Sequence, residues 1–241
     1  MKKELIEQVK KISVFLTEEQ AEQLIQYYEM LVEKNKVMNL TAITEWQDVL
    51  IRHFLDSLAP VSYIDFPDEG RLIDVGTGAG FPGIPLKIAF PDWRITLMDS
   101  LNKRVNFLRE VIKKLGLSQI EVIHGRAEDL GRDPKYREQY DYCVSRAVAN
   151  MATLCEYCTP FLKRGGIFLA YKSGKIEEEL LEAKRAIHTL GCEMVKKETL
   201  VLPDSDIQRV FLFVQRKEKL SKKYPRKAGI PSKEPLGIVK R

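Results

Sequence analysis

A glycine-rich segment that begins at Asp74 has the composition of a ligand-binding loop. Its glycines Gly76, Gly78 and Gly80 stand at alternate positions, and residues without a Cβ let the backbone turn sharply and approach a ligand closely. The spacing departs from the dinucleotide fingerprint G-x-G-x-x-G, because Phe81 stands where that fingerprint needs glycine. A pyrophosphate is also disfavoured by a nearby anion, and Asp74 directly precedes the loop. The loop is therefore predicted to bind a nucleotide-like ligand that carries positive charge.

Acidic residues are also expected near the ends of the next two strands. Asp99 stands 25 residues after Asp74, where a carboxylate can accept hydrogen bonds from both hydroxyls of a ribose. After the third strand, the backbone amide of Ala127 and the side chain of Glu128 are placed to read the edge of an adenine. S-adenosylmethionine joins such an adenosine to a cationic sulfonium and ammonium, so these residues predict a site for that cofactor. Each residue alone also fits a helix cap or a tight turn.

Short apolar segments alternate with helical segments from Arg71 onward, which is typical of βαβ units with a mainly parallel sheet. The connection at residues 202–206 is too short for a helical crossover, so the last strand is predicted to be antiparallel. The pattern predicts an α/β fold of the class I methyltransferase type, with a Rossmann-like seven-stranded sheet. The expected strands are residues 72–75, 95–98, 120–123, 140–145, 167–171, 193–200 and 207–215.

The first 60 residues are predicted to be helical. A Thr-x-x-Gln capping box at Thr17–Gln20 precedes an apolar stripe at helical spacing, and Thr44–Gln47 repeats the signal before a second stripe. Both helices are expected to bury a face against another part of the chain. The expected domains are an N-terminal helical cap (1–66), an S-adenosylmethionine-dependent methyltransferase domain (67–216) and a basic C-terminal extension (217–241).

Positive charge is concentrated at the C-terminus. The whole chain has a formal net charge of +5, whereas residues 216–241 carry +8, which leaves −3 for the preceding residues. Clustered Lys and Arg favour a polyanionic partner, because contacts with phosphates release counterions. The same composition fits a solvated tail without a partner.

The protein is expected in the cytoplasm, as a monomer and away from membranes. The longest stretch without charge, Val75–Leu86, has 12 residues and is interrupted by Gly and Pro, whereas a membrane span needs about 18 apolar residues. Glu4 and Glu7 stand where a signal peptide would be apolar. The four cysteines fit a reducing compartment. Cys155 and Cys158 have C-x-x-C spacing but belong to an apolar helical stripe, so no metal is expected.

Several motifs spread over nearly the whole chain resemble one family of RNA-modifying enzymes. They are DVGTGAGFPGIPLKI at 74–88, NLT at 39–41, HFLDS at 53–57, RAE at 126–128, SRAVA at 145–149 and YPRK at 224–227. Together they resemble the ribosomal RNA small-subunit methyltransferase G family, also called glucose-inhibited division protein B. The resemblance implies methyl transfer from S-adenosylmethionine to N7 of one guanine in 16S ribosomal RNA near the decoding region. It also implies cofactor contacts at Gly76, Phe81, Ala127, Glu128 and Arg146.

The chemistry of guanine N7 is consistent with this activity. N7 already has an in-plane lone pair, so its methylation requires no general base, and catalysis is expected to depend on positioning and electrostatics. No catalytic side chain is assigned for this reason. Two other functions are considered, namely an NAD-dependent oxidoreductase and a non-enzymatic ribosome assembly factor with a relic cofactor pocket.

Basic side chains are the candidates for RNA contacts. Arg146, just beyond the fourth strand, could hold the cofactor carboxylate, the guanine O6 or an RNA phosphate, or could form a structural ion pair. Lys172, Arg226 and Lys227 are further candidates for contacts with the RNA backbone of the 16S RNA or of the small ribosomal subunit. Prolines in the tail, at 225, 231 and 235, are expected to keep it extended, part strap and part phosphate contact.

His53 and Asp56 are three residues apart on a predicted helix and therefore share a face. Two roles fit this spacing. The pair could lie near the cleft, or it could tie its helix to a neighbouring element, and the structural role is favoured.

Overall fold

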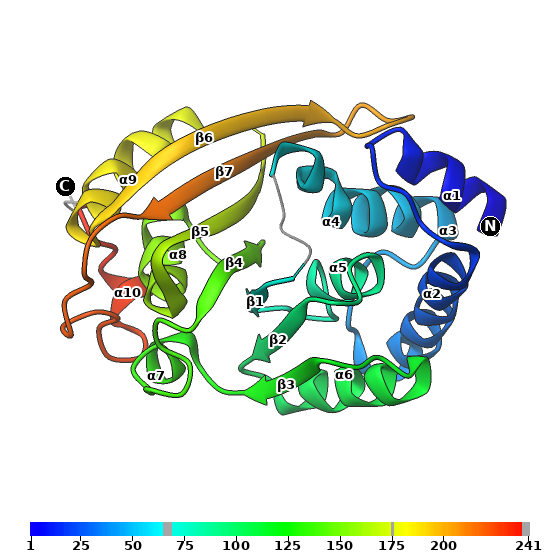
Figure 1. Cartoon of the computed structure of the whole chain (residues 1–241), viewed down its shortest axis with the longest axis horizontal. Coiled ribbons are helices and arrows are strands. Elements are labelled where there is room, and N and C mark those ends of the chain that lie inside the picture. Colours follow the sequence, from blue (N-terminus) through cyan, green and yellow to red (C-terminus); the bar gives the residue numbers. More distant parts are fainter. Residues whose placement is uncertain (65–68, 175, 238–241) are drawn as a thin grey trace.

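A single seven-stranded sheet organises the molecule, and its strand order is β3-β2-β1-β4-β5-β7-β6 (Figure 1). The computed structural model describes residues 1–64, 69–174 and 176–237. The first five strands are parallel, and β7 runs antiparallel to both β5 and β6, which confirms the predicted sheet and its antiparallel last strand. The strands are β1 (Arg71–Val75), β2 (Arg94–Asp99), β3 (Ile120–His124), β4 (Tyr140–Arg146), β5 (Leu162–Ser173), β6 (Cys192–Val201) and β7 (Gln208–Arg216).

The strand order reverses between β1 and β4. The chain proceeds outward from β1 through β2 to β3, and then returns to the other side of β1 with β4 and β5. In open α/β sheets the crevice outside the carboxyl ends of strands at such a reversal is the usual place for a ligand. The residues at this edge of the sheet are therefore the ones that can form a site.

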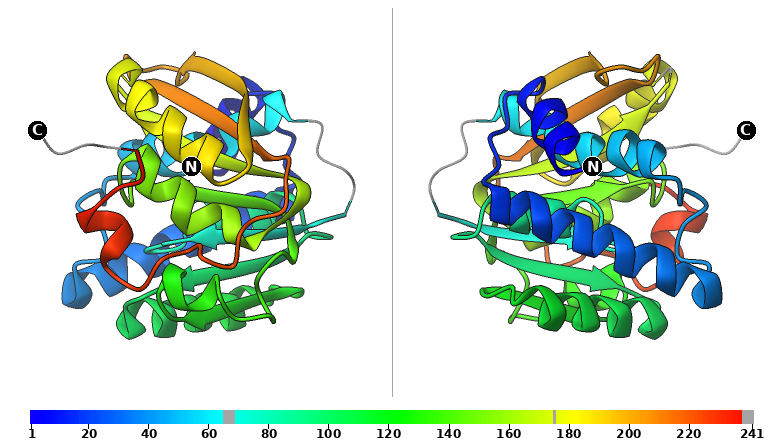
Figure 2. Two further views of the ribbon diagram at one scale, coloured as in Figure 1. Left: turned by 90° about the vertical axis from the view of Figure 1, so that its left-hand side faces the viewer. Right: turned by 90° about the vertical axis from the view of Figure 1, so that its right-hand side faces the viewer.

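The two faces of the sheet are covered by different helices (Figure 2). Alternation along β1 directs Leu72 to one hydrophobic cluster and Ile73 to the other, as expected for a strand buried on both faces. The face with Leu72 is covered by α1 (Lys2–Lys10), α2 (Glu18–Met38), α3 (Trp46–Val49), η1 (Leu50–Leu55), α4 (Asp56–Leu58), η2 (Ala59–Tyr63), α5 (Gly83–Ala89) and α6 (Asn102–Leu115). The other face is covered by α7 (Ala127–Leu130), α8 (Met151–Cys158), η3 (Thr159–Phe161) and α9 (Glu177–Thr189), with α10 (Ile230–Lys233) beside α8.

The capping box predicted at the start of the long helix is present in α2. The amide of Gln20 donates to the Thr17 hydroxyl over 3.1 Å, and the amide of Thr17 donates to Gln20 Oε1 over 2.8 Å. The second predicted capping box is wrong, since α3 begins after Glu45 and has no side-chain cap. Gln47 instead donates to Glu4 over 2.7 Å and so ties α3 to α1.

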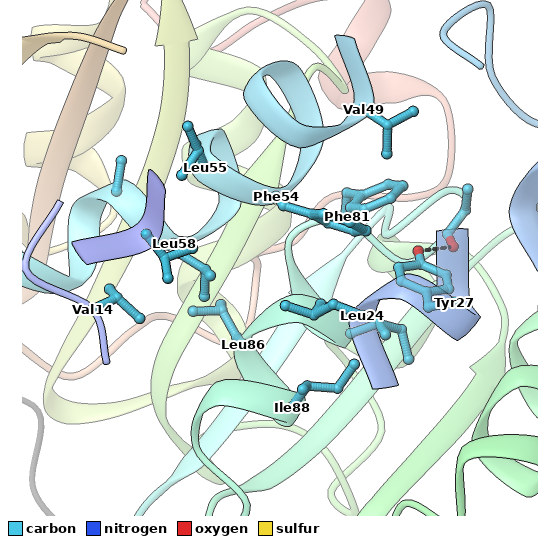
Figure 3. Packing of buried hydrophobic residues seen from close by; sticks show 14 of the residues in the cluster. Val14, Leu24, Tyr27, Val49, Phe54, Leu55, Leu58, Phe81, Leu86 and Ile88 are labelled. Atoms are coloured by element: carbon cyan, nitrogen blue, oxygen red, sulfur yellow. Dashed lines mark hydrogen bonds between the residues drawn. The ribbon is translucent and has the colours of Figure 1, made fainter. Parts of the chain in front are cut away.

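The N-terminal helices and the glycine-rich segment share one hydrophobic cluster (Figure 3). Leu24 and Tyr27 of α2 meet Leu86 and Ile88 of α5 there, and the buried Tyr27 hydroxyl donates to the carbonyl of Ala79 over 2.6 Å. The N-terminal helices therefore pack against the loop between β1 and α5 and support it on the side of α2. The boundary predicted between residues 66 and 67 lies outside the described residues.

The predicted core role of the cysteines in α8 agrees with their burial. Cys155 and Cys158 are fully buried in the cluster under α8, and the described cysteines are all free. The parts of the chain that the structure describes contain no group of three or more His, Cys, Asp or Glu side chains able to hold a metal ion. In the same ranges, no helix is both long enough and apolar enough to cross a membrane.

The prolines predicted an extended tail, but part of the tail is helical. Residues Ile230–Lys233 form the short helix α10, and Pro231 lies at its start, where proline is tolerated because the amide of the first turn needs no partner. Tyr224 and Pro225 are buried against the body of the protein. The charged residues Lys240 and Arg241 lie outside the described residues.

Candidate functional site

A cavity of about 310 Å³ opens at the carboxyl ends of β1, β2 and β4. This volume lies at the lower end of the usual range for small-molecule sites. Sequence reasoning placed Gly76, Asp99, Ala127 and Glu128 at a cofactor site, and all four line this cavity. The other lining residues are Val75, Met98, Ser100, Gly125, Arg126, Val148, Ala149, Tyr157 and Ser232.

Gly76 is required where the chain leaves β1. Its φ is +73°, and a Cβ at this position would lie 2.6 Å from Cγ2 of Val148 on the opposite wall. The amides of Gly76 and Thr77 both donate to the carbonyl of Met98, over 2.9 and 3.0 Å. The loop therefore closes directly onto the end of β2, and any side chain at Gly76 would push against the turn that follows β4.

Asp99 is the carboxylate at the end of β2, and it is 3% exposed. Its Oδ2 accepts from the amide of Gly78 over 2.9 Å, and its Oδ1 accepts from the amide of Leu101 over 2.9 Å. Oδ2 also accepts from Nη1 of Arg104 over 3.4 Å. A carboxylate oxygen can accept about two hydrogen bonds, so Oδ1 is the oxygen that keeps capacity for a ligand hydroxyl. Gly78 thus has an indirect role, because its amide orients Asp99, while the space beside its Cα is open.

Glu128 is held in place by a residue of the tail. The amide of Gly229 donates to Glu128 Oε1 over 2.8 Å, and the Glu128 side chain is 5% exposed. This contact brings the C-terminal segment to the wall of the cavity, which the sequence did not indicate.

Asp74 has a different position from the one expected. It is fully buried beneath the loop rather than in the cavity wall, and its Oδ2 accepts from the Thr77 hydroxyl over 2.6 Å and from the amide of Gly83 over 2.9 Å. Its Oδ1 is buried without a hydrogen-bond partner. Burial is the main cause that raises the pKa of Asp74 from 3.8 to about 7. Asp74 therefore braces the loop from inside and is not among the residues that line this cavity.

Gly80 and Phe81 also lie under the loop rather than in the cavity wall. A Cβ on Gly80 would meet the Tyr27 hydroxyl at 2.7 Å, so this glycine is required for packing against α2. Phe81 is 5% exposed, and its ring stacks on His53 with centroids 4.3 Å apart. Phe81 thus connects the glycine-rich loop to the helical segment η1, which contains His53.

A second cavity, of about 430 Å³, lies next to the first, at the ends of β4 and β5. The turn after β4 separates the two, because Arg146 and Ala147 line the second cavity and Val148 and Ala149 line the first. Ala147 adopts a left-handed conformation with φ of +57°, which is unfavourable for a residue with a Cβ and is found at ligand sites. The other lining residues are His53, Asp56, Tyr171, Lys172, Ser173, Glu179 and Arg209.

Arg146 is the central group of the second cavity. Its Nη1 donates to Asp56 Oδ2 over 3.0 Å and to the carbonyl of Arg52 over 3.1 Å, and its Nη2 lies 3.3 Å from His53 Nδ1. Its guanidinium carbon lies 5.2 Å from the centre of the Phe81 ring. No described residue accepts from its Nε–H, so the edge formed by Nε and Nη2 keeps donors for a planar acceptor.

His53 is neutral at physiological pH. Burial and the neighbouring positive charge of Arg146 lower the pKa of His53 from 6.5 to about 3. Nδ1 of His53 lies 3.1 Å from the Arg52 carbonyl, which would accept from an N–H, and 3.3 Å from Nη2 of Arg146, which would donate to a lone pair, so these two contacts favour opposite tautomers of the ring. Nε2 lies 3.1 Å from the Thr41 hydroxyl, which can donate or accept. The uncharged ring therefore supports Arg146 and is too weak a base to take up a proton near neutral pH.

Asp56 joins two arginines that are far apart in the sequence. Its Oδ2 accepts from Arg146, while its Oδ1 accepts from Nε of Arg209 over 3.0 Å. Asp56 is 3% exposed, so the pair of ion pairs is largely removed from water. The two roles considered for His53 and Asp56 thus occur together, because both side chains contact Arg146 and both line the second cavity. The π-helical geometry of η1 directs this part of the segment.

The predicted RNA contacts are distributed unevenly. Lys172 lines the second cavity, but its ammonium donates to the carbonyl of Ala149 and to Glu179 over 2.9 and 2.6 Å. The Arg226 guanidinium does not point to solvent as a phosphate contact would, since it forms a bidentate pair with the fully buried Glu156. Lys227 is exposed.

Sequence reasoning did not single out several of the lining residues, among them Tyr157, Arg209 and Ser232. Tyr157 lies on α8 away from the cysteine stripe, so helical spacing could have identified it as facing another surface. Arg209 of β7 and Ser232 of α10 carried no signal in the sequence, because their positions depend on how distant strands and the tail pack.

Comparisons with known proteins agree with the fold and with these motifs. Residues 20–207 match the GidB family, described as rRNA small subunit methyltransferase G. A ribosomal RNA small subunit methyltransferase G from Alkaliphilus oremlandii is 52% identical over 225 residues, which cover 93% of this chain and 94% of that protein. The protein of the same name from Staphylococcus aureus strain JH9 is 48% identical over 232 residues, covering 96% and 97%.

A solved structure shares the fold at much lower identity. M. jannaschii TYW2, crystallised in complex with AdoMet, is 18% identical to this chain, with a TM-score of 0.51 over 63% of this chain and 71% of that chain. Similarity at this level shows a common architecture of the sheet and its helices.

Proposed function

Because the chain belongs to the rRNA small subunit methyltransferase G family, we propose that it transfers a methyl group from S-adenosylmethionine to N7 of a guanine in 16S ribosomal RNA. The observation that carries this proposal is the pair of adjoining cavities at the switch point of the sheet. They are divided only by the turn from Arg146 to Ala149, so a donor in one and an acceptor in the other would meet at that turn.

The residues of the first cavity fit S-adenosylmethionine. When bound, this cofactor supplies a methyl group on a positively charged sulfonium. Asp99 Oδ1 has acceptor capacity for a ribose hydroxyl, and Glu128 Oε2 can accept from the amino group of adenine. Gly76 leaves room at the end of β1, where a side chain would collide with Val148. Asp74, which the sequence placed among the cofactor ligands, shapes the loop instead.

The groups of the second cavity fit an acceptor that needs no general base. His53, with its pKa of about 3, does not accept a proton at neutral pH, and guanine N7 carries its lone pair without losing one. The free edge of Arg146 would donate to the guanine O6 and fix the base in its plane, while leaving N7 accessible. Asp56 and Glu179 are paired with Arg146, Arg209 and Lys172, so positioning of the base by Arg146 is the contribution that the cavity makes to the transfer.

The RNA backbone would be bound by exposed cations near this edge of the molecule. Lys227 is available for phosphate contacts, and Lys172 would exchange Glu179 for a phosphate at the rim of the second cavity. Arg226 is paired with the buried Glu156, so this proposal gives it no phosphate contact. We also propose that the protein acts as a monomer in the cytoplasm, where its four buried thiols stay reduced.

Methyl transfer itself tests this function. The protein is incubated with labelled S-adenosylmethionine and, in parallel, naked 16S RNA, a partial small-subunit particle or the intact small subunit. We expect label in RNA, and the reacted RNA should break at a single guanine after borohydride and aniline treatment. Labelled RNA that resists cleavage would show that the methyl group is attached to an atom other than N7. If none of the substrates is labelled although the protein binds the cofactor, the assembly-factor function is favoured instead.

A further inference from the structure

The C-terminal segment Tyr224–Lys233, here called the strap, is fastened to the body of the protein beside the cofactor cavity. At its beginning, Arg137 donates to the carbonyl of Tyr224 over 2.8 Å, and Arg132 donates to the carbonyl of Pro225 over 2.9 Å. Near its end, the Thr153 hydroxyl of α8 donates to the carbonyl of Pro231 over 3.1 Å. Both ends of the strap are thus held by buried or half-buried groups.

The strongest attachment is the pair between Arg226 and Glu156. Nε of Arg226 lies 2.9 and 3.1 Å from the two Glu156 oxygens, Nη2 lies 2.7 Å from Oε2, and the Arg226 amide donates to Oε1 over 2.7 Å. Glu156 is fully buried on α8, and the neighbouring Tyr157 lines the cofactor cavity. Since a buried carboxylate needs a complete set of partners, this pair fixes the strap at one position on α8.

The strap also contributes to the cavity. Ser232 is one of the lining residues, and the Gly229 amide occupies Glu128 Oε1. The position of Glu128 is therefore determined by a segment about 100 residues away in the sequence. Ser232 itself has an exposed side chain at the edge of the cavity.

We propose that the strap is a fixed wall of the cofactor site, and that Arg226 and Glu156 are positioning residues that align Glu128 with the nucleoside half of S-adenosylmethionine. This inference rests on the proposed function. It assigns the YPRK segment of this chain to cofactor binding through Arg226, rather than to RNA binding alone. With the nucleoside half held at Glu128, the amino-acid half of the cofactor would lie away from the strap and would not depend on it.

Binding of two ligands to the full chain tests the proposal. S-adenosylhomocysteine has both halves of the cofactor, whereas 5′-methylthioadenosine has only the nucleoside half. Arg226→Ala should weaken both ligands by the same factor, about tenfold, because the affected contacts are on the shared half. Arg226→Lys, which keeps one charged contact with Glu156, should recover part of the affinity. Lys227→Ala, at an exposed neighbouring position, is the matched control and should bind both ligands as the wild type does.

A second substitution covers the case in which Arg226→Ala does not fold. Ser232→Trp places a large side chain at the edge of the cavity from an exposed position, and Lys233→Trp is its control on the same helix. We expect Ser232→Trp to weaken both ligands and Lys233→Trp to leave them unchanged, with thermal unfolding of the free proteins recorded for all variants.

The outcomes separate this proposal from the function on which it rests. If the wild type binds both ligands and Arg226→Ala and Ser232→Trp bind them equally well, the strap is only a structural clasp and the proposal is overturned, while the proposed function stands. Unequal losses, with S-adenosylhomocysteine affected and 5′-methylthioadenosine unchanged, would also overturn it. If the wild type binds neither ligand, the proposed function falls and the inference falls with it.

Discussion

Asp74 shows how a single buried acid can support a ligand site without contacting the ligand. One of its oxygens binds Thr77 and Gly83, the two ends of the tight part of the loop, while the other has no hydrogen-bond partner. An ionised carboxylate in this environment is costly, and its pKa is accordingly raised to about 7. The acid at this position is therefore a structural element whose charge state depends on pH.

The pH dependence of stability should reveal this group. The folded-state pKa of about 7 lies above the ordinary 3.8, so between pH 4 and pH 7 the folded protein keeps a proton that the unfolded chain has lost. The stability that Asp74 contributes is complete below about pH 4 and is lost as the pH rises to 7. Asp74→Asn should remove this dependence, a difference of about 4 kcal/mol at most across the range.

Urea unfolding at intervals from pH 4 to pH 7.5 measures this difference. His53 changes the free energy of unfolding in the opposite direction, because its lowered pKa makes the folded protein less stable as the pH falls. This contribution is the same in the wild type and in Asp74→Asn, so the difference between the two proteins isolates Asp74. Asp92→Asn, at an exposed acid, is the control and should keep the wild-type slope. Parallel curves for Asp74→Asn and the wild type would show that Asp74 ionises normally in the folded state.

At the scale of elements, the loop from β1 to α5 is supported from two sides. On one side, the Tyr27 hydroxyl of α2 donates to the Ala79 carbonyl. On the other side, at the end of β2, the Met98 carbonyl accepts from the Gly76 amide and the Asp99 carboxylate accepts from the Gly78 amide. The three glycines consequently have different functions, because Gly76 faces the cavity, Gly78 orients Asp99 and Gly80 packs against α2.

Gly78 and Gly116 form a matched pair for testing the loop. Both have φ of +63° and open space beside the Cα, but Gly116 ends α6 away from the cavities. Gly78→Val and Gly116→Val should therefore destabilise folding by a similar amount, about 1–3 kcal/mol.

Only Gly78→Val should also lower the affinity for S-adenosylhomocysteine, by at least about tenfold, because the strained residue displaces the amide that orients Asp99. Isothermal titration calorimetry on both folded variants measures the effect. Equal affinities in the two variants would mean that Asp99 is oriented without the Gly78 amide.

At the scale of the whole molecule, charge and structure divide the tail into two parts. Arg216 and Arg226 are paired with acids of the body, so they contribute to folding rather than to a partner surface. Lys219, Lys222 and Lys227 remain exposed. The excess of positive charge that the sequence places in the tail is thus smaller at the surface than its composition indicates.

Replacing the exposed lysines tests which charges reach RNA. Changing Lys219, Lys222 and Lys227 together to Gln should reduce the slope of log affinity against log salt by about 2, since each lost phosphate contact removes about 0.7 to 0.9. Affinity for S-adenosylhomocysteine should not change. Filter binding of 16S RNA at several salt concentrations measures the slope, with Lys3, Lys10 and Lys114 changed to Gln as the control. A slope equal to that of the wild type would place the RNA-binding surface elsewhere.

Most of the fold could be predicted from local sequence patterns alone, namely the spacing of apolar residues and one helix cap. The period of apolar residues located the seven strands to within a few residues, except for a longer β5, and Thr17 marked the start of α2. These features depend on interactions between residues close in sequence, which composition and spacing express directly. The same reasoning failed at Thr44, because Gln47 found a partner in Glu4 of another helix instead of capping its own.

The sequence by itself also determined which strand ends carry the site, since Asp99 and Glu128 follow strands whose carboxyl ends must meet at one edge. Only the tertiary structure decided which side chains face the cavities. It buried Asp74 and Phe81, brought Arg209 and Ser232 to the cavities and paired Arg226 with Glu156. These outcomes depend on contacts between distant segments, where packing and the need of each buried charge for a partner select one neighbour among many.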